Sequence, residues 1–245
     1  MKKRLVMGLA AFLVLCIGFI YWFYFSIPSS FPTDQEVAER INKAFPGAVV
    51  STVLDKLPAD ERHLVIPFIS EEDDYGLSYW VWEQREWKIA EVDGGGRPKI
   101  WKVDVKDPSS YRIVWNIRPD QQTHSVSFYA VQHRNYSWGD EFERYVPRVQ
   151  MEKEVLLSSS QYGMIAFPEE WLSYLESEQQ ASTSTSHGST LTSMYMDSTL
   201  QFGWNLYDEA KNETHGTWGR RSGESYSFER ENIEFLYSVY KSELE

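Results

Sequence analysis

The stretch SYWVWEQREWKIAEVDGGG, residues 78–96, decides the fold of the part of the chain that follows the N-terminus. Two runs rich in aromatic and β-branched residues flank the polar segment EQRE, which is the pattern of a β-hairpin. A turn in this segment places Trp82 opposite Trp87 and Trp80 opposite Ile89. Because side chains alternate between the two faces of a strand, these four apolar residues share one face.

Such a group of indole rings forms either the core of the domain or an exposed platform for a ring-shaped ligand. The other face of the hairpin carries a mixed set, namely Tyr79, Val81, Lys88 and Ala90. An apolar face opposite a mixed face is typical of a half-buried hairpin in an antiparallel sheet. We therefore expect the tryptophans in the core beneath a helix, with the exposed platform as the alternative.

The covering helix is predicted just before the strands. Residues 33–36 read T-D-Q-E, the form of a capping box, and Val37, Ile41 and Ala44 follow at helical spacing before Pro46-Gly47. One amphipathic helix is therefore expected to cover one face of the sheet.

The N-terminus carries a second strong signal. Residues 5–25 contain no charge, and a helix of this length crosses a bilayer core of about 30 Å. The run ends in YWFYF, an aromatic belt, and lacks the small residues of a cleavage site, so it is predicted to be an uncleaved signal anchor. Cys16 follows Leu15 inside the apolar run, which argues against a lipoprotein signal.

The distribution of basic residues predicts the orientation of this anchor. Three basic residues occupy positions 2–4, and the next one after the span is Arg40. The positive side stays in the cytoplasm, so residues 1–26 form a cytoplasmic stub and a single-pass transmembrane anchor of the cell membrane. Residues 27–32 contain two prolines and are expected to form an extended spacer to an extracytoplasmic domain.

Composition restricts the class of protein. The only cysteine is Cys16, so the external part uses no disulfides and fits a bacterial surface protein. The formal net charge is -12, and removal of the three basic residues at positions 2–4 leaves about -15 on the remainder. This balance disfavours nucleic acid, or a surface of anionic lipid, as the partner.

The rest of the chain alternates short apolar segments with polar or Gly/Pro breaks, which predicts an antiparallel meander. The expected strands are residues 48–54, 63–69, 77–82, 87–92, 99–105, 111–117, 125–133 and 146–157. Pro168 is expected to open a short helix that ends near Glu178. We therefore predict an α+β fold, with an extracytoplasmic domain over residues 33–180.

The C-terminal part begins with ASTSTSHGSTLTS, residues 181–193, which has no apolar period and is predicted to be a Ser/Thr-rich linker or loop. Residues 194–245 form a β-rich segment, with strand character over 194–207 and 225–240. About fifty residues make a marginal independent core. We expect their strands to add to the preceding sheet or to form a small satellite layer, and a second domain is the alternative.

A helix followed by a long meander with the W-x-I strand Trp87-Lys88-Ile89 resembles cystatin-like and nuclear-transport-factor-like rolls. The similarity covers residues 33–105. It implies a helix packed against a curved antiparallel sheet and carries no function.

The sequence contains none of the standard catalytic or cofactor signatures. There is no H-E-x-x-H, G-x-S-x-G, phosphate-binding G-x-x-x-x-G-K-[ST] or paired-cysteine metal motif. Asp93 to Gly96 is glycine-rich, but Arg97-Pro98 follows where a phosphate loop would open a helix, so a turn between strands is predicted. The S-x-x-K match at residues 238–241 lacks the other elements of penicillin-recognising enzymes and is expected to be accidental.

Candidate metal ligands are equally sparse. Glu71-Glu72-Asp73-Asp74 lacks the spacing of a calcium loop and is predicted to be a solvated acidic turn. The five histidines have no partner at metal-ligand spacing, although His124 and His133 could lie near one hairpin. We expect no metal and no cofactor.

The leading functional prediction is a membrane-anchored bacterial surface protein without catalytic machinery, which contacts another envelope protein in regulation or assembly. The alternative is a module that binds cell-wall glycan, with Trp138 and Trp218 as the exposed rings that stack on sugars. A wall-modifying hydrolase would need a pair of carboxylates assembled by the fold.

Overall fold

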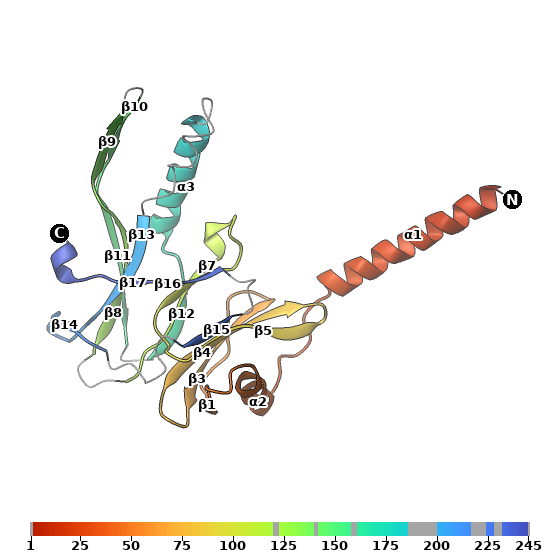
Figure 1. Cartoon of the computed structure of the whole chain (residues 1–245), viewed down its shortest axis with the longest axis horizontal. Coiled ribbons are helices and arrows are strands. Elements are labelled where there is room, and N and C mark those ends of the chain that lie inside the picture. Colours follow the sequence, from red (N-terminus) through yellow and green to blue (C-terminus); the bar gives the residue numbers. More distant parts are fainter. Residues whose placement is uncertain are drawn as a thin grey trace.

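The computed structural model describes residues 2–119, 123–139, 142–157, 161–185, 200–216, 224–227 and 232–244; within these ranges, residues 2–6, 137–139, 142–144, 179 and 181–185 are described by their backbone. The described chain is α+β, with three α-helices: α1 (Lys2–Phe25), α2 (Asp34–Ala44) and α3 (Glu169–Thr185). Figure 1 shows α1 projecting from a sheet-rich body. Residues 7–25 of α1 are long and apolar enough to span a membrane, and no part of this stretch is buried in the body.

The first sheet, sheet A, lies against α2. Its order is β1-β3-β4-β5-β15, and β2 pairs with β3 outside this path. The strands are β1 (Val50–Val53), β2 (Leu57–Pro58), β3 (His63–Ser70), β4 (Tyr75–Glu83), β5 (Glu86–Asp93) and β15 (Ser225–Ser227). All of these pairings are antiparallel, as expected from the sequence.

Two further sheets complete the body. Sheet B has the order β12-β7-β6-β16, and sheet C has the order β11-β8-β13-β14, with β17 parallel to β13. Sheet B contains β6 (Lys99–Lys102), β7 (Tyr111–Asn116), β12 (Tyr162–Ala166) and β16 (Asn232–Phe235). Sheet C contains β8 (Ser125–Gln132), β11 (Val149–Leu156), β13 (Leu200–Tyr207), β14 (Glu213–Thr214) and β17 (Tyr237–Ser238). A separate hairpin pairs β9 (Asn135–Gly139) with β10 (Phe142–Val146), and short 3-10 helices cover Pro108–Ser110 and Lys241–Glu243.

The predicted hairpin register is confirmed in β4 and β5. Trp82 pairs with Trp87 and Trp80 pairs with Ile89, around a two-residue turn. Trp80, Trp82 and Trp87 are buried in one cluster with apolar residues of α2, such as Ile41. The tryptophans therefore form the core beneath the helix and do not form an exposed platform.

The prediction of a half-buried hairpin is wrong, because its second face is buried too. Tyr79 and Val81 on that face pack in one cluster with Trp101 of β6 and Val114 of β7. Asn116 also crosses between the sheets, where its amide donates to the carbonyls of Phe68 and Gly76 at 3.0 and 2.7 Å. Sheet B thus covers the face that the mixed pattern had suggested was solvated.

Sheet B is itself covered on its other face by sheet C and α3. Trp115 of β7 lies in one cluster with Phe128 of β8, Trp204 of β13 and Trp171 of α3. The order of layers is therefore α2, sheet A, sheet B, then sheet C with α3. This stacking explains why so many strands carry large apolar side chains on both faces.

Several elements differ from the prediction. β12 was missed, and the segment predicted as one strand over 146–157 is divided between the end of β10 and β11. α3 was expected to end near Glu178 but runs to Thr185, because an established helix tolerates Ser and Thr at modest cost per residue. The first five residues of the predicted linker 181–193 are therefore helical.

The C-terminal strands join existing sheets. β15 extends sheet A, β16 extends sheet B, and β13, β14 and β17 belong to sheet C. These strands were expected to add to one preceding sheet. They do add to preceding strands, but they are distributed over three sheets. The resemblance to cystatin-like and nuclear-transport-factor-like rolls is not confirmed by this layered arrangement.

Candidate functional site

The junction between the apolar helix and the body is held by side chains from two connections of sheet A, the one before β3 and the turn between β4 and β5. The two terminal nitrogens of Arg62 donate to the carbonyls of Tyr24 and Ser26, at 3.0 and 2.7 Å. The guanidinium of Arg85, in the turn between β4 and β5, lies 3.8 Å from the ring centroid of Trp22. Arg62 thus satisfies a carbonyl of the last turn of α1, where a cation is also favoured by the helix dipole.

Two tryptophans of the hairpin hold the chain that follows α1, at Ser26 and in the spacer. The indole N–H of Trp82 donates to the Ser26 carbonyl at 3.2 Å, and that of Trp87 donates to the Ser29 carbonyl at 3.1 Å. Phe31 packs edge-on against Trp87, with 5.1 Å between ring centroids. We name the side chains of Arg62, Trp82, Trp87 and Arg85 the clamp. The proline-containing spacer is therefore bound along the hairpin and does not act as a free tether.

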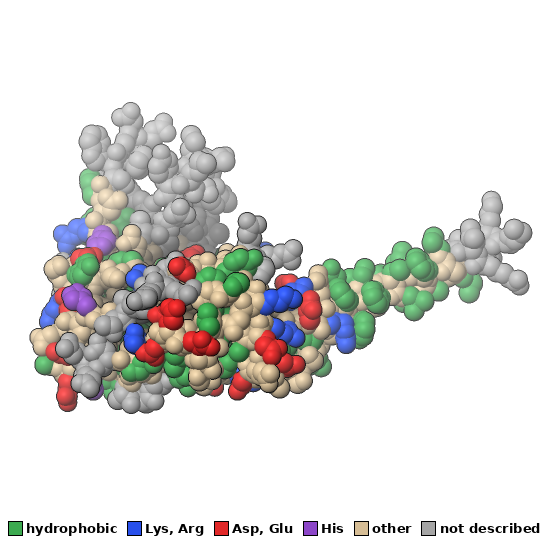
Figure 2. All heavy atoms as spheres, turned by 60° about the horizontal axis from the view of Figure 1, so that its bottom comes forward, with side chains coloured by type: hydrophobic (Ala, Val, Ile, Leu, Met, Phe, Trp, Pro, Cys, Tyr) green, Lys and Arg blue, Asp and Glu red, His purple; other side chains and the backbone are tan. Residues whose placement is uncertain are grey.

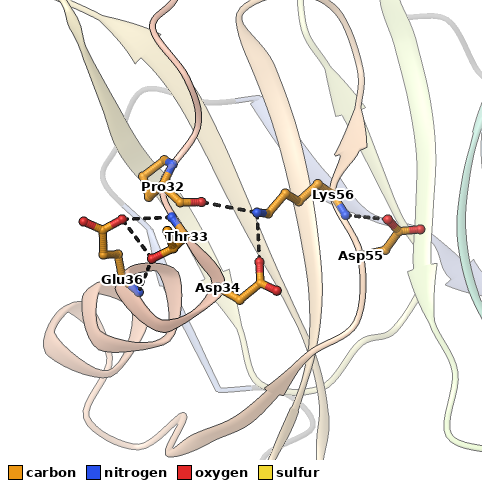
Figure 3. A network of polar contacts seen from close by, with 6 residues as sticks. All are labelled: Pro32, Thr33, Asp34, Glu36, Asp55 and Lys56. Atoms are coloured by element: carbon orange, nitrogen blue, oxygen red, sulfur yellow. Dashed lines mark hydrogen bonds and ion pairs between the residues drawn. The ribbon is translucent and has the colours of Figure 1, made fainter.

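The entry into α2 is fixed by the polar network drawn in Figure 3. Thr33 and Glu36 form the predicted capping box, in which the Thr33 backbone N–H donates to Glu36 at 2.8 Å. This backbone hydrogen bond, followed by that from the Thr33 hydroxyl, lowers the pKa of Glu36 below its ordinary value of 4.5. Lys56 donates to the Pro32 carbonyl and pairs with Asp34 at 2.8 Å, so the end of the spacer is tied to sheet A as well.

A groove of about 790 Å³ lies beside the clamp, between the C-terminal half of α2 and the β4–β5 hairpin. We call it the α2 groove. It is lined by Arg40, Lys43, Ala44, Trp80, Val81, Glu83, Gln84, Glu86, Trp87, Lys88, Ile89, Ala90 and Tyr226. Its lining includes residues of the hairpin turn, so it reaches the part of the body that contacts α1 (Figure 1).

The cations of the α2 groove are only partly used within the protein. Arg40 donates one hydrogen bond, to the Trp87 carbonyl at 3.2 Å. Lys88 donates to Gln84 at 2.6 Å and lies 3.6 Å from Glu86. Lys43 makes no ion pair with any residue that the structure describes.

A second group of charges is fully buried between sheets A and B. The ammonium of Lys99 contacts Glu91 and lies 3.2 Å from Asp93, and its side chain is 1% exposed. Asp93 also accepts the backbone N–H of Gly95 at 3.0 Å, within the glycine-rich turn. Burial, with the charges of Asp93 and Glu91, raises the pKa of Tyr79 well above its ordinary value. None of these groups lines the α2 groove, so we assign the cluster to fixing the β5–β6 connection.

A third feature is the hairpin of β9 and β10, which we call the arm. Figure 1 shows it extending beyond the end of the β8–β11 pair, away from the body. Tyr136 and Tyr145 are directly opposite each other in its ladder and are 55% and 59% exposed. The arm thus presents an exposed aromatic pair.

Of the two tryptophans predicted for glycan binding, the structure describes the backbone of Trp138 alone. Trp138 lies in the arm, where its backbone pairs with that of Glu143. Trp218 lies outside the described residues.

The remaining sequence candidates have structural roles. Asp73 of the acidic segment pairs with Arg118, and among the described residues no three His, Cys, Asp or Glu side chains gather as metal ligands. His124 and His133 flank opposite ends of β8, so the fold does not bring these two side chains together. The glycine-rich stretch is a connection between strands, as predicted, since β6 follows it.

Sequence reasoning missed the clamp and the α2 groove. Their basic residues come from α2, from the connection before β3 and from the hairpin turn, so no local motif marks them. The one available signal was the pair Glu83 and Arg85 at a polar turn inside an otherwise apolar hairpin.

Comparison with protein-family models, with curated proteins and with solved structures finds no match to this chain. The functional assignment therefore depends on the geometry of the site.

Proposed function

We propose that this chain is a single-pass interaction module of a bacterial envelope, whose body lies on the extracytoplasmic side and contacts another envelope protein. The three basic residues in the first turn of α1 and the lack of cysteine after this helix support this placement. No step of catalysis is assigned to it.

The clamp is the observation that carries the proposal. Four side chains of the body bind the last turns of α1 and the spacer, so the body has a defined orientation relative to the anchor. A free tether would suit a domain that searches the space above the membrane. A clamped body instead suits a module that meets a partner held in the same membrane, because both are then presented at a fixed height.

The arm is the element that we expect to make this contact. Exposed tyrosines are enriched in protein interfaces, because they bury a large area with few rotatable bonds. Tyr136 and Tyr145 form such a pair in the arm, which extends beyond the β8–β11 pair.

Site-specific photo-crosslinking in cells tests the proposal. A photoreactive amino acid at position 136 or 145 is compared with one at Glu209, an exposed turn residue between β13 and β14. We expect one envelope protein to be captured from both arm positions and not from position 209. Equal capture of the same proteins from all three positions would contradict a partner-binding arm.

The exposed aromatic pair also favours a second candidate, binding of cell-wall glycan by the arm that contains Trp138. The flat apolar face of a tyrosine or tryptophan ring can stack on the apolar face of a sugar ring. Co-sedimentation of the protein with purified wall polymer distinguishes the two candidates. Binding that Trp138→Ala, Trp218→Ala or the change of both tyrosines to Ala abolishes would favour the glycan; no sedimentation would leave the protein partner.

A further inference from the structure

The net charge of the residues that line the α2 groove has the opposite sign to that of the chain as a whole. The chain carries a formal net charge of -12, yet the α2 groove is lined by Arg40, Lys43 and Lys88 against Glu83 and Glu86. Arg85 does not line the groove, but it adds a further cation in the same turn as Gln84 and Glu86, which do. Figure 2 shows Lys and Arg side chains, with Asp and Glu side chains among them, beside the base of the apolar helix.

The position of Arg85 fixes the depth of this cationic surface. Trp22 lies three residues before the end of α1, in the aromatic belt predicted to sit at headgroup level. Because the guanidinium of Arg85 stacks on the Trp22 ring, it lies at the same level. Ile27, just beyond the helix, is 87% exposed, which is expected for an apolar side chain that meets the boundary of the bilayer.

The backbone of the turn gives an independent indication. Gln84 and Arg85 both have positive φ, 52° and 66°. A two-residue turn of this kind favours Asn-Gly, since glycine adopts positive φ without strain. The chain instead places a long cationic side chain there, and such local strain is often found at ligand-binding positions. Arg85 makes no ion pair with the residues that the structure describes, so its charge is available.

We infer that the mouth of the α2 groove binds the phosphate headgroup of an anionic phospholipid, in the leaflet that the body faces. Arg85 contacts the phosphate at headgroup level, and Lys43 and Arg40 add positive charge within the groove. Glu86 lies beside Lys88, at 3.6 Å, and is neutralised by it. The inference concerns a ligand separate from the protein partner proposed for the arm.

Native mass spectrometry of the full chain tests the inference. The protein in detergent is mixed with equal amounts of phosphatidylglycerol and phosphatidylcholine with the same acyl chains, and the ratio of bound lipids is measured. The test variant is Lys43→Gln with Arg85→Gln. The control is Lys106→Gln with Lys153→Gln, two exposed lysines remote from the groove. The basic residues at positions 2–4 are present throughout, so only differences between variants are interpreted.

We expect the native chain and the control to prefer phosphatidylglycerol to the same degree. Each basic side chain near an anionic surface contributes roughly a fivefold preference, so the test variant, which loses two of them, is expected to lose about twenty-fivefold. An unchanged ratio in the test variant, or an equal loss in the control, would overturn the inference. The tryptophan emission spectrum verifies that each variant is folded.

Two competitors distinguish the source of the phosphate. Inorganic phosphate and glycerophosphoglycerol, added to the native chain, are expected to leave the bound lipid ratio unchanged. Displacement of phosphatidylglycerol by either soluble phosphate would overturn the assignment to a lipid. Binding of a polyglutamate peptide that needs Lys43 and Arg85, together with an unchanged lipid ratio in the test variant, would instead assign the groove to an acidic protein segment.

Discussion

Arg85 lies with its guanidinium 3.8 Å from the ring centroid of Trp22, which joins the turn of the β4–β5 hairpin to the apolar helix. The same hairpin holds the spacer through the indole N–H groups of Trp82 and Trp87. Its tryptophans therefore have two roles, since their rings fill the core beneath α2 and their N–H groups orient the body relative to α1.

Loss of the two indole hydrogen bonds is expected to release the spacer. Trp82→Phe with Trp87→Phe keeps most of the ring packing and removes two donors, each worth about 1 kcal/mol. A nitroxide on a cysteine at Ser30, in a Cys16→Ser background, is expected to become more mobile by electron paramagnetic resonance. Trp171→Phe is the control, because the N–H of this buried indole finds no acceptor among the described residues. An unchanged spectrum in the double variant would show that the two bonds do not hold the spacer.

The buried charges of Lys99, Glu91 and Asp93 predict that the free energy of unfolding depends strongly on Lys99. Lys99→Met leaves Glu91 and Asp93 buried without their cation, which is expected to cost about 3–5 kcal/mol of unfolding free energy. Lys102→Met, which breaks the more exposed pair with Glu234, is expected to cost less than about 1 kcal/mol. Denaturant unfolding of the full chain in nanodiscs measures both. Similar losses in the two variants would contradict the assigned role of the cluster.

The capping box predicts that the stability of the folded chain depends on pH. The pKa of Glu36 is lowered in the folded state by its hydrogen bonds from Thr33, so the folded state favours the carboxylate. Its contribution to stability is therefore present above pH 4.5 and is lost as the pH falls through the folded-state pKa.

We expect Glu36→Gln to be less stable than the native chain at pH 7, and the difference to shrink below pH 4.5. Glu39→Gln, on the same helix, is the control, and its difference from the native chain is expected to vary less with pH. Unfolding free energies measured between pH 7 and pH 3 decide this; a constant difference for Glu36→Gln would rule out the capping carboxylate as the titrating group.

The strained turn predicts a separation of stability from lipid preference. Gln84→Asn with Arg85→Gly creates the Asn-Gly turn that this backbone favours, and is expected to raise the free energy of unfolding by about 1 kcal/mol. The same variant is expected to lose part of its preference for phosphatidylglycerol. A variant that gains stability and keeps the full preference would show that Arg85 is not needed for the lipid.

The sequence predicts an element well where its apolar residues follow a single periodicity, either that of a helix or that of a strand. The hairpin register at Trp82 and Trp87, the capping box at Thr33 and the apolar helix all follow from residues close together in the chain. The second buried face of the hairpin could not be predicted, because the residues that cover it, such as Trp101 and Val114, come from another sheet.

The site was less accessible to sequence reasoning than the fold. Arg40, Arg62 and Arg85 come from different elements, and nothing in their spacing shows that they meet. The contacts of Arg62 with the carbonyls of Tyr24 and Ser26, and of Arg85 with Trp22, depend on how the hairpin lies against the end of α1. The formal net charge of -12 for the whole chain also gave no sign of the local excess of cations.

The most direct test of the account measures how close the hairpin turn lies to the membrane. A fluorophore on a cysteine at Gln84, in a Cys16→Ser background, is reconstituted with lipids that carry a quencher on the headgroup. The same label at Glu209 is the reference. We predict strong quenching at position 84, little at position 209, and reduced quenching at position 84 when Arg62→Gln, Trp82→Phe and Trp87→Phe are combined. Equal quenching at positions 84 and 209 would contradict a body clamped to the membrane surface.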